Sequence, residues 1–183
     1  MAQPAAGDRS DLRALVVGRL RDVQDFPKPG VLFKDITGLL ADGPAFRRVT
    51  DALAEHARSV GGVDLVAGVE ARGFIIAAAV ATALTCGLVP IRKAGKLPPP
   101  SVGADYDLEY GRARIEVPLG LLDGRRVLLV DDVLATGGTL AAAADLIEAA
   151  GGALAGLAVM LELSALGGRG RIAPREVTAL VEL

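Results

Sequence analysis

The feature that most constrains the fold of this chain is the alternation of short apolar runs with longer helix-like stretches. Two intervening stretches, residues 73–85 and 138–150, have the length and the alanine-rich composition of helices, and two glycines follow the second. Runs that are apolar on both faces and alternate with helices are typical of a parallel sheet covered on both sides. We therefore predict an α/β fold, with a central, mostly parallel sheet flanked by helices. Its expected strands are residues 63–70, 88–93, 125–132, 153–163 and 176–183.

Two further helical patterns precede the first of these runs. Residues 11–23 place apolar side chains at helical spacing after an acid, and residues 44–58 begin with a proline, which a first helical turn tolerates. The prolines of residues 26–30 predict an extended or turning segment between them. His56, the single histidine, lies on the second helix among polar residues. We interpret it as a solvated surface residue, and we exclude catalysis by histidine.

Composition and charge narrow the class of protein. With 183 residues, of which 51% are apolar and 23% charged, the chain is expected to form a single domain over residues 1–183 with a sizeable core. The net charge of −2 argues against nucleic acid as a partner, because a nucleic-acid surface needs a basic excess. Cys86 is the single cysteine, which fits a reducing cytosol, and we interpret it as a small buried apolar residue.

One uncharged stretch, residues 73–91, reaches the roughly 18 residues that a membrane-spanning helix needs. It contains five alanines and two threonines, with glycine and proline near its end, so a buried helix followed by a buried strand explains it better. The start of the chain has an acid and an arginine where an export signal needs a long apolar core. We therefore expect a cytoplasmic protein with no membrane partner.

Two adjacent carboxylates, Asp131 and Asp132, end the apolar run in "VLLVDDVLATGGTL", residues 127–140. In open α/β sheets, ligands bind outside the carboxyl ends of the strands. Neighbouring residues of a strand point to opposite faces, so at least one of these acids is expected to be buried. A buried carboxylate is costly unless a cation or hydrogen-bond donors compensate it.

A small-residue turn, "ATGGT" at residues 135–139, follows the acids and opens the helix over residues 138–150. Its glycines let the backbone approach a ligand, its threonines offer hydroxyls, and the free N–H groups of the first helical turn favour an anion. The lysine of a P-loop is missing, so we expect a monophosphate here. Together, the turn and the acids indicate a sugar phosphate whose hydroxyls donate to Asp131 and Asp132. The alternative is a plain strand–turn–helix junction in which the acids cap the helix.

Residues 127–139 resemble the phosphoribosyl-pyrophosphate (PRPP) motif of the type I phosphoribosyltransferases, with an apolar strand, two acids and a glycine-containing turn. Other segments resemble the adenine phosphoribosyltransferases in particular, in order and at similar separations. The likeness covers roughly residues 23–163. These segments are "FPKPGVLFKDIT" at residues 26–37, "EARGF" at 70–74, "IRKAGKLP" at 91–98 and "YDLEYG" at 106–111.

The resemblance implies the type I phosphoribosyltransferase fold, with an N-terminal hood over about residues 1–40 and a flexible catalytic loop over about residues 94–114. Proline, glycine and mixed charge in that loop also predict a lid or binding loop, whose flanks could pair as a hairpin. Members of the family join adenine to PRPP and release AMP and pyrophosphate, with Mg²⁺ held mainly through PRPP and water. The resemblance also implies a homodimer. It supplies no set of protein ligands for the metal.

Roles for individual residues follow from the same resemblance. Asp131 and Asp132 hold the ribose hydroxyls and stabilise positive charge at C1′. Glu109 is the general acid or base, and Tyr110 belongs to the lid. The adenine is bound by Leu32, Phe33 and Lys34, the last standing where an arginine is often found. The 5′-phosphate is held by Ala135, Thr136, Gly137, Gly138 and Thr139, and the pyrophosphate by Arg72, Arg92, Lys93 and Lys96.

Three alternatives remain open at this point. A phosphoribosyltransferase for hypoxanthine or guanine, xanthine, uracil or orotate would carry the same PRPP motif. A PRPP-binding regulator would keep the fold without catalysis, but such regulators usually carry a DNA-binding module, and the residues before "FPKPG" supply one helix at most. A non-enzymatic nucleotide-binding module would have no use for Arg72 and Glu109.

Overall fold

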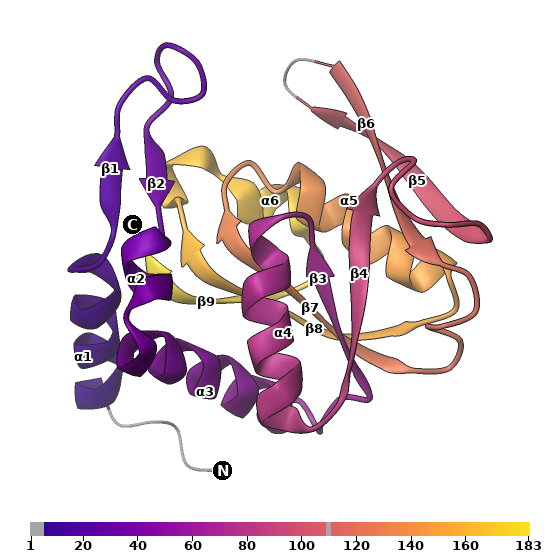
Figure 1. Cartoon of the computed structure of the whole chain (residues 1–183), viewed down its shortest axis with the longest axis horizontal. Helices are drawn as coiled ribbons and strands as arrows, with labels where there is room; N and C mark the ends of the chain where they lie inside the picture. Colours follow the sequence, from indigo (N-terminus) through magenta and orange to yellow (C-terminus); the bar gives the residue numbers. More distant parts are fainter. Residues whose placement is uncertain (1–5, 109–110) are drawn as a thin grey trace. The chain divides into compact units, whose positions relative to one another are not determined.

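The computed structural model describes residues 6–108 and 111–183, drawn in Figure 1. The chain forms two compact units, Met1–Thr50 and Asp51–Leu183. Each unit has its own sheet. The expectation of one domain over residues 1–183 stays a prediction.

The first unit is built around a two-stranded antiparallel sheet. In this sheet Val23 lies opposite Phe33, and Arg21 lies opposite Asp35. The predicted helix over residues 11–23 is wrong in its second half, because the helix ends before Gly18 and the chain continues as a strand. The apolar pattern of residues 11–23 could not reveal that the end of this segment pairs with a second strand about ten residues later in the chain. The elements are α1 (Ala6–Val17), β1 (Arg21–Val23), β2 (Phe33–Asp35), α2 (Thr37–Ala41) and the start of α3 (Gly43–Ser59).

The second unit contains a seven-stranded sheet of order β5-β6-β4-β3-β7-β8-β9. The strands from β4 to β9 through β3, β7 and β8 are parallel to their neighbours, while β6 runs antiparallel to β4 and β5. The mostly parallel sheet is therefore confirmed. Its strands are β3 (Leu65–Val69), β4 (Gly87–Lys93), β5 (Ser101–Leu108), β6 (Gly111–Pro118), β7 (Arg126–Leu134), β8 (Ala153–Glu162) and β9 (Val177–Glu182).

Helices cover both faces of this sheet, with α4 (Arg72–Leu84) on one face and α5 (Gly138–Ala149) on the other (Figure 1). Ala67 and Val69 of β3 belong to the buried cluster that includes α5. On the opposite face, a Cβ atom at Gly68 would lie 2.6 Å from Cβ of Ala77 in α4. Alternate residues of one buried strand thus face different helices, which explains why these strands are apolar throughout.

The segment expected to be an irregular loop is largely a long β-hairpin. Strands β5 and β6 pair in register from Ser101 opposite Pro118 to Leu108 opposite Gly111. The prediction underestimated this pairing because Pro98, Pro99 and Pro100 suggested a loop, whereas they end just before the strand begins. The hairpin lies beside α5, and Val102 and Tyr106 pack against the core.

Two smaller features also differ from expectation. His56 is not a solvated residue, since its Nε2 atom is fully buried and would lie 3.4 Å from a Cβ atom at Gly156 of β8. Burial lowers the pKa of His56. The chain between β8 and β9 forms a 3₁₀ turn (Ser164–Leu166) and a short helix, α6 (Gly168–Ile172), which no sequence pattern indicated. Across the described residues, none of the helices has the length and hydropathy to cross a membrane.

Candidate active site

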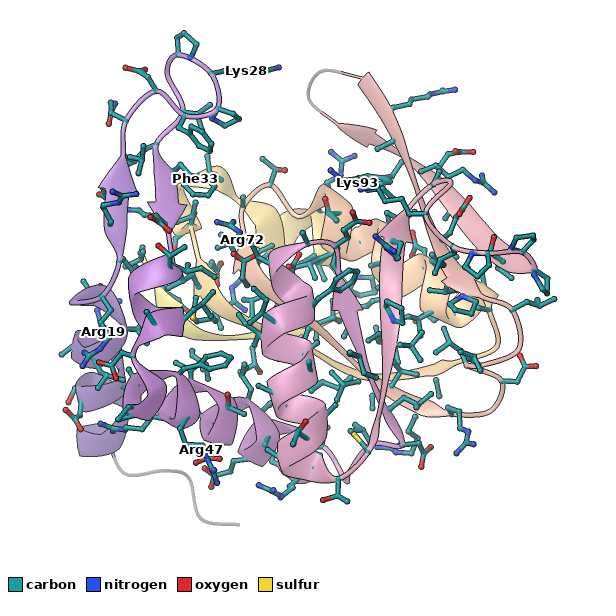
Figure 2. The ribbon with its side chains drawn as sticks, viewed as in Figure 1. Arg19, Lys28, Phe33, Arg47, Arg72 and Lys93 are labelled. Carbon is teal, nitrogen blue, oxygen red and sulfur yellow. The ribbon has the colours of Figure 1, made fainter. Side chains whose placement is uncertain are left out.

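The carboxyl ends of the parallel strands meet at one edge of the large sheet, and the second unit places most of the predicted site residues there. Figure 2 shows Arg72 at the start of α4 and Lys93 at the end of β4, both at this edge. Asp131 and Asp132 lie near the end of β7, and the turn into α5 follows them. The topology thus brings together residues that are up to 67 positions apart, from Arg72 to Thr139.

The two aspartates lie inside β7 and not at its end, which corrects their expected place. The strand continues to Leu134 because it still pairs with β8, whereas its pairing with β3 stops at Val130. The acids therefore begin where the neighbouring strand has ended. Asp132 is the buried member, at 4% exposure, and Asp131 is partly exposed.

Asp132 has one close cationic neighbour and one unsatisfied atom. Nε of Arg72 lies 2.7 Å from Oδ2 of Asp132. The Asp132 Oδ2 atom is fully buried and accepts no hydrogen bond from the described residues, so the ion pair with Arg72 compensates its charge. Burying a carboxylate oxygen without a hydrogen-bond donor costs free energy. This atom is therefore suited to accept a hydrogen bond from a ligand hydroxyl.

Burial raises the pKa of both aspartates. Burial raises the pKa of Asp131 well above its ordinary value, and the neighbouring Asp132 charge raises it further. The Asp132 backbone N–H, which donates to Oδ1 of Asp131 at 2.9 Å, lowers this pKa. For Asp132, the Arg72 guanidinium offsets part of the effect of burial on its pKa. Two negative charges held close together in a buried site favour a ligand that carries or develops positive charge.

Gly73 brings the start of α4 directly against the acids. A Cβ atom at this position would lie 2.6 Å from Oδ1 of Asp131 and 3.2 Å from the carbonyl oxygen of Val130. Any side chain here would push the helix away from β7. Helix α4 begins without a side-chain cap, so its first N–H groups also face this edge. The sequence carried one signal of this contact, a glycine at the second position of a helix.

The turn at residues 135–139, here called the phosphate turn, opens α5. Gly137 precedes the helix with φ +82°, a conformation that favours glycine, and α5 has no side-chain cap. Thr136 is exposed and Thr139 half-buried. The uncapped helix start, with two threonines beside it, matches the expected anion site.

Glu70 contacts three of the residues predicted to bind pyrophosphate, Arg92, Lys93 and Lys96. Its carboxylate accepts hydrogen bonds from Nζ of Lys96 at 2.5 Å, from Nε of Arg92 at 3.4 Å and from the backbone N–H of Lys93 at 2.9 Å. The Lys96 hydrogen bond is the main reason that the pKa of Glu70 falls to about 2. Arg92 also lies 6.0 Å above the ring centre of Phe74.

Sequence reasoning gave Glu70 no role. Its side chain is only 9% exposed, although the residue follows the end of β3. A glutamate next to an apolar run was the available signal. It could not be tied to Arg92 and Lys96, because their contact depends on the parallel pairing of β3 with β4.

The residues expected to bind the base lie in the first unit. Leu32 is 43% exposed, and Val31 and Phe26 beside it are 41% and 50% exposed. The Phe26 and Phe33 rings meet edge to face with centres 5.1 Å apart. Nζ of Lys34 lies 2.7 and 2.9 Å from the two carboxylate oxygens of Asp22, so the Lys34 side chain is engaged in an ion pair across the β1–β2 hairpin. Figure 2 shows Lys28 extending from the loop that joins β1 and β2.

Glu109 and Tyr110 lie outside the described residues, so their roles stay predictions. Within the described part of the chain, no group of three or more His, Cys, Asp or Glu residues could hold a metal ion. The acid pair could still contribute to a Mg²⁺ site, because Mg²⁺ is commonly bound by one or two carboxylates together with substrate phosphates and water. The donor set therefore fits a cation carried in by a polyphosphate.

Comparison with known proteins agrees with this geometry. Residues 36–178 match the family described as phosphoribosyl transferase domain. An adenine phosphoribosyltransferase from Mycobacterium avium (strain 104) is 52% identical over 177 residues, covering 96% of this chain and 97% of the relative. One from Frankia casuarinae is 58% identical, covering 91% of this chain and 88% of the relative.

Solved structures give the same result. The adenine phosphoribosyltransferase of Rhodothermus marinus has a TM-score of 0.90 and 40% identity to this chain, and covers 95% of it with 99% of its own length. The yeast Saccharomyces cerevisiae enzyme was solved with adenine and an imino-altritol bisphosphate, and has a TM-score of 0.87, 33% identity and coverages of 96% and 99%. The paired acids of β7, the uncapped turn beside them and this likeness over nearly the whole length lead to one conclusion: the chain belongs to the adenine phosphoribosyltransferase family and has the type I phosphoribosyltransferase fold.

Proposed function

We propose that this chain transfers the 5-phosphoribosyl group of PRPP to adenine, giving AMP and pyrophosphate, as a step of purine salvage. The observation that carries the proposal is the acid pair of β7, with the buried Oδ2 atom of Asp132, in the strand that leads to an uncapped helix start. A ribose hydroxyl and a phosphate are complementary to these two features. The named activity of the relatives supports the choice of adenine.

The donor is held by the second unit. The 5′-phosphate accepts hydrogen bonds from the N–H groups and hydroxyls of the phosphate turn, Ala135–Thr139. The 2′ and 3′ hydroxyls donate to Asp131 and Asp132. As the bond from C1′ to the pyrophosphate oxygen breaks, positive charge develops on the ribose, and the acid pair stabilises it.

The leaving pyrophosphate is received by cations at the same edge. Arg72 is 34% exposed while it pairs with Asp132, so its guanidinium is accessible to a ligand. The side chains of Arg92 and Lys96 pair with Glu70, and a pyrophosphate would compete with that carboxylate for their charge, while Lys93 contacts Glu70 through its backbone N–H. Mg²⁺ bound with PRPP would neutralise part of the phosphate charge. Asp131 and Asp132 are the protein carboxylates available to share it.

The acceptor is bound by the first unit, through the exposed segment that contains Leu32, Phe33 and Lys34. Its backbone can recognise the base without the Lys34 side chain, which is engaged by Asp22. When N9 of adenine forms its bond to C1′, the base loses a proton, and Glu109 accepts it. Tyr110 is assigned to a lid that excludes water from the reacting groups. A homodimer is expected for this family.

The decisive experiment is a steady-state assay with PRPP and each candidate base. Adenine should give the highest kcat/KM when compared with hypoxanthine, guanine, xanthine, uracil and orotate, and chelation of Mg²⁺ should stop AMP formation. A higher kcat/KM for any other base would contradict the assignment of adenine. Binding of PRPP without turnover of any base would indicate a PRPP-binding regulator instead.

A further inference from the structure

The phosphate turn rests on a second backbone segment that belongs to neither β7 nor α5. A Cβ atom at Gly137 would overlap the carbonyl oxygen of Gly168 and lie 3.2 Å from its Cα atom. A Cβ atom at Gly168 would overlap the carbonyl oxygen of Ala135 and lie 3.1 Å from the Gly137 nitrogen. The two glycines therefore touch backbone to backbone, and the buried first residue of α6 sets the position of the turn.

The next residue, Arg169, attaches α6 to the ends of β8 and β9. Its Nε donates to both carboxylate oxygens of Glu162, at 2.8 and 2.9 Å. Its Nη1 donates to the carbonyl oxygen of Val177 at 2.8 Å, and its Nη2 donates to Glu182 at 3.2 Å. One guanidinium thus fixes a five-residue helix to two strands at once.

The carboxylate that Arg169 contacts, here called the anchor, belongs to Glu162 at the end of β8. The Glu162 side chain is 6% exposed and closes β8, where it lies opposite both Leu134 and Glu182 in the sheet. The backbone N–H of Leu163 donates to Leu134, the residue just before the phosphate turn. The Arg169 side chain is 46% exposed, but its guanidinium meets the buried Glu162 carboxylate through several N–H groups, which gives the contact a defined geometry.

We propose that Arg169 is a positioning residue for the phosphate turn. Through Glu162, Val177 and Glu182 it holds Gly168 against Ala135 and Gly137, so that the N–H groups at the start of α5 stay aimed at the 5′-phosphate. Arg169 touches no substrate and acts through α6. The inference rests on the proposed function, since it assumes that this turn binds the phosphate of PRPP and of AMP.

The test compares ligands that differ only in the 5′-phosphate. Dissociation constants for AMP and for adenosine are measured with the wild type and with Arg169→Met, alongside KM for PRPP and kcat. Arg169→Met should weaken AMP binding and raise KM for PRPP by roughly tenfold or more, because small displacements of positioning groups are costly. Adenosine binding should stay unchanged, and kcat should change less than KM.

A matched control removes a different arginine from the same region. Arg175 follows α6 and joins Asp145 and Glu148 of α5, with two Nη2–oxygen distances of 2.6 Å, but it does not hold Gly168. Arg175→Met should therefore leave the ratio of AMP affinity to adenosine affinity unchanged. If Arg175→Met changes that ratio as much as Arg169→Met, or if Arg169→Met weakens both ligands equally, the positioning role is wrong.

Two conservative variants keep the test valid if Arg169→Met does not fold. Arg169→Lys can still pair with Glu162 but cannot also reach Val177 and Glu182, and Glu162→Gln keeps the shape of the anchor without its charge. Both should show a smaller loss confined to AMP, and equal losses for AMP and adenosine would overturn the inference. A wild type that binds AMP better than adenosine yet makes no AMP from adenine and PRPP would refute the activity alone.

Discussion

At the scale of single residues, the candidate site contains two acids, Asp131 and Asp132, in an environment that destabilises their charged forms. Asp131 and Asp132 are adjacent, the first half-buried and the second buried, and desolvation raises the pKa of each. Between the ordinary carboxyl pKa of 3.8 and the raised native value, the folded state binds more protons than the unfolded state. Stability therefore falls as pH rises through this window, so the acid pair lowers the free energy of unfolding at neutral pH.

Replacing Asp131 by asparagine should separate stability from function. Asp131→Asn removes the repulsion with Asp132 but keeps an oxygen for the Asp132 N–H, so the midpoint of thermal unfolding at pH 7 should rise by a few degrees. The difference from wild type should shrink as the pH falls toward and below 3.8, because the wild-type carboxyl is protonated in both states only below the unfolded pKa. We expect kcat to fall about 10²-fold because charge at C1′ is less stabilised.

The control for this change is Asp123→Asn, at an exposed aspartate in the turn before β7. It should alter neither the unfolding midpoint nor kcat. Thermal melts at pH 7 and near pH 4, together with kcat measurements, decide the point. A less stable Asp131→Asn protein at pH 7 would contradict this prediction. It would mean that the contacts of the Asp131 carboxylate add more to the free energy of unfolding than its burial subtracts.

Proton transfer is assigned to a different residue, Glu109. Glu109→Ala should lower kcat by about 10²-fold or more, the usual contribution of a general base, while PRPP affinity changes little. Asp105→Ala is the matched control, because Asp105 is an acid of β5 close to Glu109 in the sequence and pairs with Arg114 at the surface. An unchanged kcat in Glu109→Ala, measured under saturating adenine and PRPP, would remove the residue from the mechanism.

At the scale of elements, close backbone contacts decide how the helices meet the strands. Gly68 and Gly73 let α4 lie directly against β3 and β7, and Gly137 lets the phosphate turn meet α6. A Cβ atom would collide with the Ala77 side chain at Gly68, with the acid pair at Gly73 and with backbone at Gly137. Both helices that begin at this edge lack side-chain caps, so their first N–H groups are directed toward the place where a ligand would bind.

Gly137→Ala tests whether the contact with α6 matters beyond the conformation of glycine. The residue has φ +82°, and its new Cβ would also meet Gly168, so we expect KM for PRPP to rise at least about tenfold. Gly120 has a similar φ, +79°, and nothing within 4 Å of a Cβ atom. Gly120→Ala should therefore show only the conformational cost, about 1–2 kcal/mol of unfolding free energy.

Steady-state kinetics and chemical unfolding of both variants give the answer. The Gly137 variant should lose more stability than the Gly120 variant and should also bind PRPP more weakly. Equal losses of stability with normal KM for PRPP would show that the collision is relieved without moving the turn.

At the scale of the whole molecule, donor and acceptor are assigned to different compact units. The residues proposed to bind PRPP belong to Asp51–Leu183, and those proposed to bind the base belong to Met1–Thr50. The donor unit uses a parallel sheet edge with convergent charges, whereas the acceptor unit offers exposed apolar side chains beside a small hairpin. This division agrees with the chemistry, because PRPP is highly charged and adenine is a flat, neutral base.

The sequence by itself determined the local parts of this picture. Each apolar run became a strand with ends shifted by two residues at most, and the helices after β3 and β7 were confirmed within one residue. These elements could be predicted because their signals, continuous apolar character and a glycine turn, lie within one segment. The likeness of residues 127–139 to a PRPP motif was likewise local, and family membership confirmed it.

The tertiary structure alone decided which distant residues touch. The pairing of Glu70 with Arg92 and Lys96, the approach of Gly73 to Asp131, the burial of His56 against β8 and the contact of Gly168 with the phosphate turn all cross between elements. No periodicity or motif encodes such contacts, because they depend on strand order and on how closely two backbones can approach. The sequence therefore pointed to the groups that are proposed to bind PRPP, and only the packing of the second unit determined what holds them in place.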